Sequence, residues 1–348
     1  MPPLNISHSR RSAIAARDVL TLIGTIALAA CQDAPSAPSV AHQSPAPNTA
    51  ISGGCGITAC PPAPPILFVR DTNNVSYIYR AYPDGTGVKR LAKGTRPAWS
   101  PDGTKVAFVR VVSGYSQIFT MNADGTGVTQ RTFGAAKHRD PAWSPGGGRI
   151  AFSGTVKDAS NLDIYVMNVN GTGLVRITSK TAVDREPAWR RDGKYLAFTS
   201  NRAAGVDQVF KINVDGTTHI ATALTSVLGY TASSPAYSPD GTKLLFNFQP
   251  LTPAIVGRGS APCGMAVANT DVTTLVRIES TQFPCGHGSF SPDGKQIAFD
   301  SYDSAGQGYR VFTMNLDGSN VAQVTPTTPP LTGRTSDTRP AWKPPAPQ

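Results

Sequence analysis

Short apolar runs recur along the chain from residue 66 onward, and glycine, proline and aspartate separate them. The most regular runs end in phenylalanine, at residues 106–108, 150–152, 196–198 and 297–299. Their apolar positions are consecutive rather than alternating, which indicates strands that are buried on both faces between neighbouring sheets. We therefore expect a stack of small sheets that share their faces.

A second motif precedes these runs. It reads Pro-Ala-aromatic followed by Ser-Pro-Asp-Gly in its full form, and its copies begin at residues 97, 141, 187, 235, 288 and 340. The spacing of 44 to 53 residues is typical of one four-stranded propeller blade. Ser-Pro-Asp-Gly fits a type I turn, so each copy predicts a short opening strand, a tight turn and the buried second strand.

A third strand, such as 118–122, leads in most copies into an Asp-Gly or Asn-Gly turn, and a fourth strand, such as 128–131, follows. The remaining fourth strands are predicted at 174–178, 220–225 and 321–325. Asp-Gly turns can also suggest calcium or phosphate binding. Each turn here lies between two apolar strands at hairpin spacing, so the turn conformation alone explains the residues.

The ends of the array predict how it closes. Runs at 66–69, 77–81 and 88–91 supply a second, third and fourth strand before the first full copy, and 340–342 supplies an opening strand after the last. Together they complete one composite blade, which removes the exposed edges of a linear array. We predict an all-β, six-bladed β-propeller over residues 66–344, with three strands from the N-terminus and one from the C-terminus in the closing blade.

These motifs resemble the TolB-like (WD40-like) propeller repeat, in which Pro-x-Trp-Ser-Pro-Asp-Gly, Ile-Ala-Phe, Ile-Tyr-x-Met and Asp-Gly recur in this order. TolB itself carries a further α/β domain ahead of its propeller, and residues 32–65 are too few to form one. Serine peptidases of the prolyl-oligopeptidase type also carry such repeats, but the sequence has no Gly-x-Ser-x-Gly motif. The resemblance therefore implies the fold and leaves the function open.

The N-terminal segment predicts export and lipid anchoring. Arg10, Arg11 and Arg17 precede an apolar run at 19–30 that is too short to span a membrane, and Leu28-Ala29-Ala30-Cys31 looks like a bacterial lipobox. We expect residues 1–31 to be a lipoprotein signal peptide, with Cys31 as the lipidated residue. An ordinary signal peptide with a chance cysteine is the alternative.

The next segment, 32–65, is rich in proline, alanine and serine and lacks helical or strand periodicity, so we expect a disordered tether. Residues 345–348 form a short tail. An even number of cysteines in an exported chain favours disulfides. We expect Cys55 to pair with Cys60, and Cys263 with Cys285 across the least regular repeats; a zinc site is the weaker alternative.

Composition narrows the partners only slightly. The chain of 348 residues is 40% hydrophobic and 16% charged, and its 32 Lys and Arg against 22 Asp and Glu give a net charge of +10. Such an excess of positive charge fits an ordinary soluble surface. The more specific interpretation is that the protein binds an anionic partner.

The residues just before the opening strands carry most of the candidate chemistry, because in a propeller this position surrounds one mouth of the central channel. They are Arg96, Arg139, Asp140, Arg185, Glu186, His287 and Arg339. We expect His138 and Arg334 to lie above this ring. The charges either pair across blades as structural salt bridges or bind an anionic group from a peptide, an acidic glycan or an envelope component.

The alternative function is a carbohydrate-active enzyme of the polysaccharide lyase or hydrolase type. Oligogalacturonate lyases, which are similar propellers, gather several histidines on a metal ion. Only His138 and His287 fall near the mouth here, so three imidazole ligands are not available. We predict a monomeric, non-enzymatic scaffold without a metal or cofactor, anchored to a bacterial membrane, that binds an envelope protein or an anionic glycan or peptide and no nucleic acid.

Overall fold

The computed structural model describes residues 63–155, 161–179, 181–215, 219–226, 229–251, 264–279, 286–302, 308–326 and 335–344. The predicted signal peptide, nearly all of the tether and the tail lie outside these residues. So do Arg334 and the cysteines Cys31, Cys55, Cys60, Cys263 and Cys285. The predicted lipidation and disulfides therefore stay predictions.

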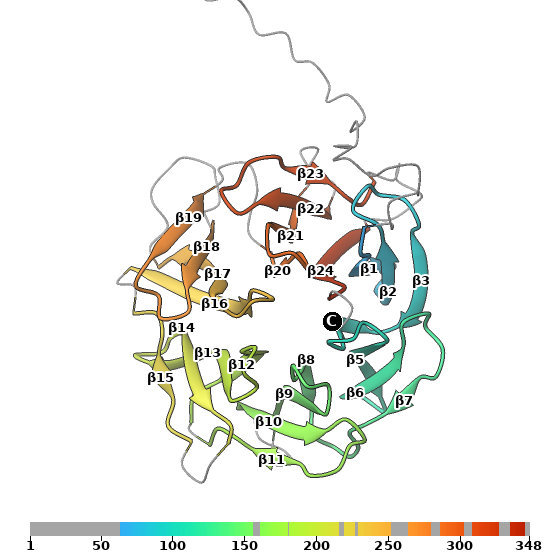
Figure 1. Ribbon diagram of the computed structural model, residues 1–348. Helices are drawn as coiled ribbons and strands as arrows, with labels where there is room; N and C mark the ends of the chain where they lie inside the picture. Colours follow the sequence, from blue (N-terminus) through green and yellow to red (C-terminus); the bar gives the residue numbers. More distant parts are fainter. Residues whose placement is uncertain are drawn as a thin grey trace, which may run out of the picture. The chain divides into compact units, whose positions relative to one another are not determined.

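The described residues form six four-stranded sheets, arranged as blades in a ring (Figure 1). The first three blades contain β24 (Ser336–Trp342), β1 (Ile66–Thr72), β2 (Val75–Ala81) and β3 (Lys89–Lys93); β4 (Thr95–Trp99), β5 (Lys105–Val112), β6 (Tyr115–Asn122) and β7 (Thr129–Gln130); and β8 (His138–Trp143), β9 (Arg149–Thr155), β10 (Leu162–Asn168) and β11 (Val175–Arg176).

The other three blades contain β12 (Asp184–Trp189), β13 (Tyr195–Ala203), β14 (Val206–Asn213) and β15 (Thr222–Ala223); β16 (Tyr230–Tyr237), β17 (Lys243–Pro250), β18 (Gly264–Asn269) and β19 (Leu275–Glu279); and β20 (Gly288–Phe290), β21 (Gln296–Tyr302), β22 (Tyr309–Asn315) and β23 (Ala322–Gln323). Within each blade, the strands are antiparallel and follow the order opening, second, third and fourth.

The ring closes as the sequence predicts. The C-terminal strand β24 pairs with β1 in the same sheet as β2 and β3, with Ile66 opposite Trp342 and Leu67 opposite Ala341. The fold is therefore a six-bladed propeller whose last blade takes three strands from the N-terminal side and one from the C-terminal side.

Apolar side chains fill the spaces between blades. The buried residues separate into six clusters, one between each pair of neighbouring blades. The second strand contributes to two of them: Val106 and Phe108 pack toward the preceding blade, and Ala107 and Val109 toward the next. This confirms that the consecutive apolar runs are buried on both faces.

The hairpin turns between third and fourth strands need glycine because they approach the neighbouring blade. Gly171 has a φ of +91°, and a Cβ atom there would lie 2.7 Å from the carbonyl oxygen of Arg131. An L-residue would meet both a disfavoured backbone and a clash. The blade that lacks this glycine places Val272 in the left-handed region instead, with a φ of +56°, where it packs against the neighbouring cluster.

The fourth strands at 129–130, 175–176, 222–223 and 322–323 are shorter than predicted, with two residues each. A threonine replaces the missing part of the ladder. The Thr132 hydroxyl accepts a hydrogen bond from the Ile118 amide at 2.9 Å, and Thr178 does the same for Ile164 at 2.9 Å. The side chain ends the outer strand early without leaving a buried amide unpaired.

Among the described residues, no helix is long and apolar enough to cross a membrane.

Candidate functional site

The opening strands of five blades have a β-bulge next to the proline of the repeat. The residue at the bulge has a positive φ in five blades, although none of these residues is glycine. The residues are Arg96 (+54°), Asp140 (+52°), Glu186 (+58°), Ser234 (+54°) and Arg339 (+55°). Helical backbone conformations are disfavoured for the residue before a proline, and a left-handed conformation of a non-glycine residue costs free energy. Backbone strain is therefore concentrated at these five residues.

These five side chains, together with His287 from the sixth blade, line a cavity of about 230 Å³ on the propeller axis. We call this set of six residues the channel mouth. Opening strands begin at this end of the propeller, so the blades position its side chains through rigid, buried strands.

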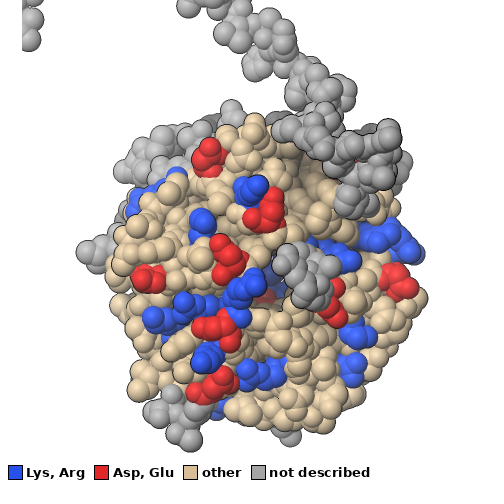
Figure 2. All heavy atoms as spheres, viewed as in Figure 1, with Lys and Arg blue, Asp and Glu red and all other residues tan. Residues whose placement is uncertain are grey.

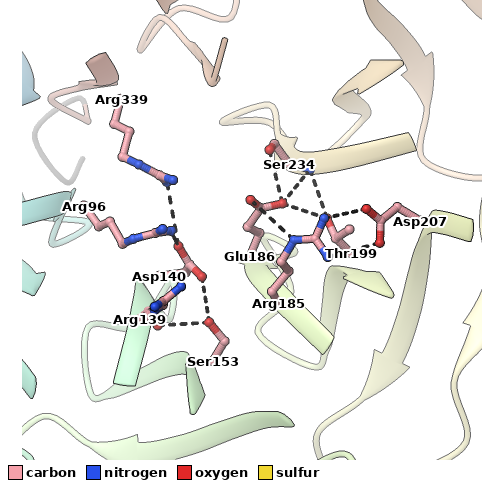
Figure 3. A network of polar contacts seen from close by, with 10 residues as sticks. All are labelled: Arg96, Arg139, Asp140, Ser153, Arg185, Glu186, Thr199, Asp207, Ser234 and Arg339. Carbon is pink, nitrogen blue, oxygen red and sulfur yellow. Dashed lines mark hydrogen bonds and ion pairs between the residues drawn. The ribbon is translucent and has the colours of Figure 1, made fainter. Parts of the chain in front are cut away.

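One half of the mouth contains two arginines that share one carboxylate (Figure 3). Asp140 pairs with the Arg96 guanidinium and lies 3.7 Å from Nη1 of Arg339, and its other oxygen accepts a hydrogen bond from Ser153 at 2.7 Å. Burial alone would raise the pKa of Asp140, but the charges of Arg96 and Arg339 outweigh it and hold this pKa below its usual value. Burial and the like charge of Arg96 lower the pKa of Arg339.

The other half of the mouth contains Glu186, which accepts hydrogen bonds from its own blade and from the next one (Figure 3). The Oε2 atom of Glu186 accepts hydrogen bonds from the Thr199 hydroxyl at 2.9 Å and the Ser234 amide at 3.0 Å. Arg185 lies 3.9 Å from Glu186 but makes its bidentate contact with Asp207, at 2.6 and 3.1 Å. Glu186 therefore has local partners of its own.

The sixth position differs from the others. A buried carboxylate, Asp300 on β21, accepts hydrogen bonds from the amides of His287 at 2.9 Å and Arg339 at 3.0 Å. The same oxygen lies 3.6 Å from Nδ1 of His287. Asp300 thus fixes the backbone of two neighbouring blades. In the described part of the chain, no group of three acidic, histidine or cysteine side chains is placed to hold a metal ion.

Not all the residues proposed from sequence lie at the mouth. Arg96, Asp140, Glu186, His287 and Arg339 line the cavity. By contrast, the Arg139 side chain is exposed, Arg185 turns to Asp207, and His138 is buried between blades. Ser234 lines the cavity but was missed because it carries no charge. Its position before Pro235 in the repeat was the available signal.

His138 is a packing residue in this structure. Its Nδ1 atom lies 3.1 Å from Oε1 of Gln117, and its ring contacts Phe152 edge-on at a centroid distance of 5.1 Å. Burial lowers the pKa of His138 from 6.5 to about 4. The neutral imidazole is therefore the form that the folded protein accommodates at physiological pH.

This histidine predicts a pH dependence of stability. Below about pH 6.5 the unfolded chain takes up a proton at His138, while the folded protein stays neutral there until about pH 4. Stability should therefore fall as the pH decreases through this window, by about 2 to 3 kcal/mol in total from this residue. Urea unfolding at pH 7 and pH 4.5 would measure it, and His138→Gln should reduce the loss by that amount. An unchanged pH profile in the variant would contradict this assignment.

Acidic and basic groups are also interspersed elsewhere on the propeller. On the face seen in Figure 2, side chains of both signs alternate around the centre of the ring. Local pairing of opposite charges, and not one extended field, describes the electrostatics of that face.

Comparisons with known proteins agree with the fold. Residues 136–256 match the family of the TolB beta propeller domain. None of the curated proteins matches the sequence. The solved structures that are similar include TolB from Acinetobacter baumannii, at 22% identity and a TM-score of 0.68, covering 81% of this chain and 67% of that one.

Two other similar structures have different roles. Hydrazine synthase of Kuenenia stuttgartiensis has a TM-score of 0.62 at 17% identity, covering 81% of this chain and 47% of that one. A chain of a nidogen–laminin complex has a TM-score of 0.58 at 14% identity, covering 79% and 98%. At these identities the likeness concerns the fold alone, which enzymes and binding proteins share. The chain thus carries a six-bladed β-propeller, of which residues 136–256 match the TolB beta propeller domain.

Proposed function

We propose that the protein is an exported, lipid-anchored envelope protein whose propeller binds an anionic group of an envelope partner at the channel mouth, without catalysing a reaction. The observation that carries this proposal is the pair of arginines, Arg96 and Arg339, which share the single carboxylate of Asp140.

The charges in this half of the mouth are unequal. Two guanidinium groups face one carboxylate, and each arginine offers five N–H donors. The side chains of Arg96 and Arg339 are 23% and 24% exposed, whereas that of Asp140 is 8% exposed. A bound anion would therefore meet the arginines first, with donors still available on both.

The shape of the site also fits a small group better than a broad surface. A cavity of about 230 Å³ takes the end of a chain or a single side chain. A carboxylate can accept two parallel hydrogen bonds from one guanidinium, which gives direction as well as affinity. The preferred ligand is therefore a carboxylate at a peptide terminus or on an acidic side chain or sugar.

Only the sequence supports the proposed location of the protein at a bacterial membrane. Leu28-Ala29-Ala30-Cys31 ends an apolar run preceded by arginines, and a proline-rich segment follows it. A diacylated Cys31 would hold the propeller near a bacterial membrane, where other envelope proteins and glycans are the available partners.

A pair of short neutral peptides tests the binding proposal, one with a free C-terminal carboxylate and one with a C-terminal amide. We expect the acid to bind the full-length protein about tenfold more tightly than the amide, because only the acid makes charge-assisted hydrogen bonds. Arg339→Ala should remove this difference. Arg139→Ala is the matched control, because Arg139 is exposed and does not line the cavity. Equal affinity of the parent protein for acid and amide would overturn the proposal.

A further inference from the structure

The positive charge of the chain is concentrated in one sector. Residues 89–139 contain nine Lys and Arg against two acidic residues, Asp102 and Asp124, so this stretch supplies most of the net charge of +10. It forms β3 and the whole of the next blade, β4 to β7, up to the start of β8.

The two acidic residues of this stretch lie at the end of the blade away from the channel mouth. Asp102 is in the turn between β4 and β5, and Asp124 is in the turn between β6 and β7. Each accepts hydrogen bonds from a threonine two residues later, Thr104 and Thr126. They are therefore used within their own turns and do not neutralise the mouth side of the blade.

The mouth side of this sector carries exposed basic residues on the two blades that flank the β4–β7 blade. Lys93 ends β3, and Lys137 and Arg139 stand at the start of β8; all three are exposed. In the described part of the chain, none of the three forms an ion pair with an acidic side chain. Their charge is available to a partner.

Two large apolar side chains of the same stretch are also exposed at the mouth side. Phe133, in the connection from β7 to β8, is 71% exposed, and Val111, at the end of β5, is 66% exposed. Soluble surfaces carry single exposed apolar residues routinely, but an exposed phenylalanine amid unpaired cations is typical of contact sites. Phe133 is not part of any of the six core clusters, so packing of the core does not explain this residue.

Hydrogen bonds hold this part of the surface together. The buried amide of Gln117 donates to the carbonyls of Gly134 and Ala136, both at 3.0 Å, and so fixes the connection that carries Phe133 against β6. Arg110, which lies opposite Gln117 on β5, donates to the Lys93 carbonyl at 3.0 Å. The connection that carries Phe133 and the end of β3 that carries Lys93 are thus both hydrogen-bonded to the β4–β7 blade.

We infer that Lys93, Val111, Phe133, Lys137 and Arg139 form a second docking surface, the basic-apolar patch, for an acidic protein segment that carries an apolar side chain. Charge complementarity identifies the partner as acidic, and the exposure of Phe133 and Val111 adds the apolar contact. This surface is separate from the channel mouth, which Phe133 and Lys137 do not line.

The first described strand begins at the end of the propeller opposite the basic-apolar patch. Ile66 lies opposite Trp342 at the far end of β24 from Arg339, and the Pro65 carbonyl accepts a hydrogen bond from the Lys343 amide at 2.9 Å. The chain therefore enters the propeller at the end away from the mouth. The basic-apolar patch lies at the mouth end.

A labelled, C-terminally amidated peptide of alternating acidic and leucine or phenylalanine residues tests the inference by fluorescence anisotropy. We expect Phe133→Ser and the pair Lys137→Glu, Arg139→Glu each to weaken binding about tenfold. Ile220→Ser, at a residue 72% exposed on another blade, should leave binding within about twofold. Both losses should also appear in an Arg339→Ala background, which lacks carboxylate binding at the channel mouth, and this separates the two surfaces.

Three outcomes would overturn the inference. The first is an acidic peptide that fails to bind or binds as well when its acidic residues are replaced by amides. The second is a parent-like affinity of the Phe133→Ser variant whose melting curve is unchanged. The third is binding of the full-length chain, without its lipid, to vesicles of phosphatidylglycerol and phosphatidylcholine in equal parts that depends on the same residues, which would make the patch a membrane contact.

Discussion

Deleting residues from Thr338 onward is expected to lower the melting temperature by about 10 °C or more, or to prevent folding. The deletion removes most of β24, which is the opening strand of the closing blade, and exposes the edge of β1. It also removes Trp342, which is 8% exposed and packs with Ile66 and Phe68 in the cluster between the last and first blades. A propeller without this contact becomes an open array with a free edge.

Two variants make this prediction specific. Trp342→Ala keeps the strand and should cost about 3 to 5 kcal/mol, as for other buried aromatic residues. A truncation after Pro344 keeps β24 intact and should melt like the parent. Thermal unfolding followed by circular dichroism compares all three. If the chain that ends before Thr338 melts within a degree or two of the parent, the closing role of β24 is wrong.

Asp140→Asn should have the second largest effect, and it should change stability and binding in opposite directions. The free energy of unfolding should fall by about 3 kcal/mol or more, because Arg96 and Arg339 then lose the carboxylate that they share and still face each other. The affinity for a free peptide carboxylate should rise by about fivefold, because the ligand no longer competes with the protein's own acid.

The pH dependence follows from the same residue. The folded protein holds the pKa of Asp140 below its ordinary value, so its stabilisation is complete above about pH 4 and is lost as the pH falls through the lower folded pKa. Asp207→Asn is the matched control, since Asp207 also pairs with arginine but is 28% exposed, and it should cost about 1 kcal/mol or less. Equal losses in the two variants would contradict the special role of Asp140.

The fold could be predicted from the sequence because every level of the repeat agrees. Apolar runs set the buried strands, Ser-Pro-Asp-Gly sets the turn, and the incomplete copies at the two ends require a shared blade. The outer strands were predicted too long. Their apolar residues, such as Leu174 and Ile220, suggested continued pairing, but they are 55% and 72% exposed. Threonine side chains end the ladder there, and a hydrophobic pattern does not reveal this.

The channel mouth was predicted only in part, and the β-bulge is the reason. Arg139 and Asp140 both precede Pro141, and a shift of one residue reverses the side to which a strand residue points. The structure turns Asp140 into the cavity and leaves Arg139 exposed, and the same bulge selects Glu186 over Arg185. Spacing in the sequence cannot decide between such neighbours. Selecting by charge also passed over Ser234, which holds the equivalent position.

The contacts between the charged side chains could not be predicted from the sequence, for another reason. Whether ring charges neutralise each other depends on which side chains meet across blades. Asp140 meets two arginines, whereas Glu186 is held by Thr199 and Ser234, and neither pattern follows from the order of residues. The excess of positive charge beside Asp140 emerges only from these contacts.

The most direct measurement for the proposed function is the NMR spectrum of the arginine guanidinium groups, in protein labelled with ¹⁵N at arginine, during titration with the peptide acid. We expect the signals of Arg96 and Arg339, assigned by substitution, to shift with the acid and to stay in place with the amide. The signal of Arg139 should not move with either. If the signals of Arg96 and Arg339 stay unchanged at a concentration of acid that saturates binding, the two arginines serve the structure alone and the proposed site is wrong.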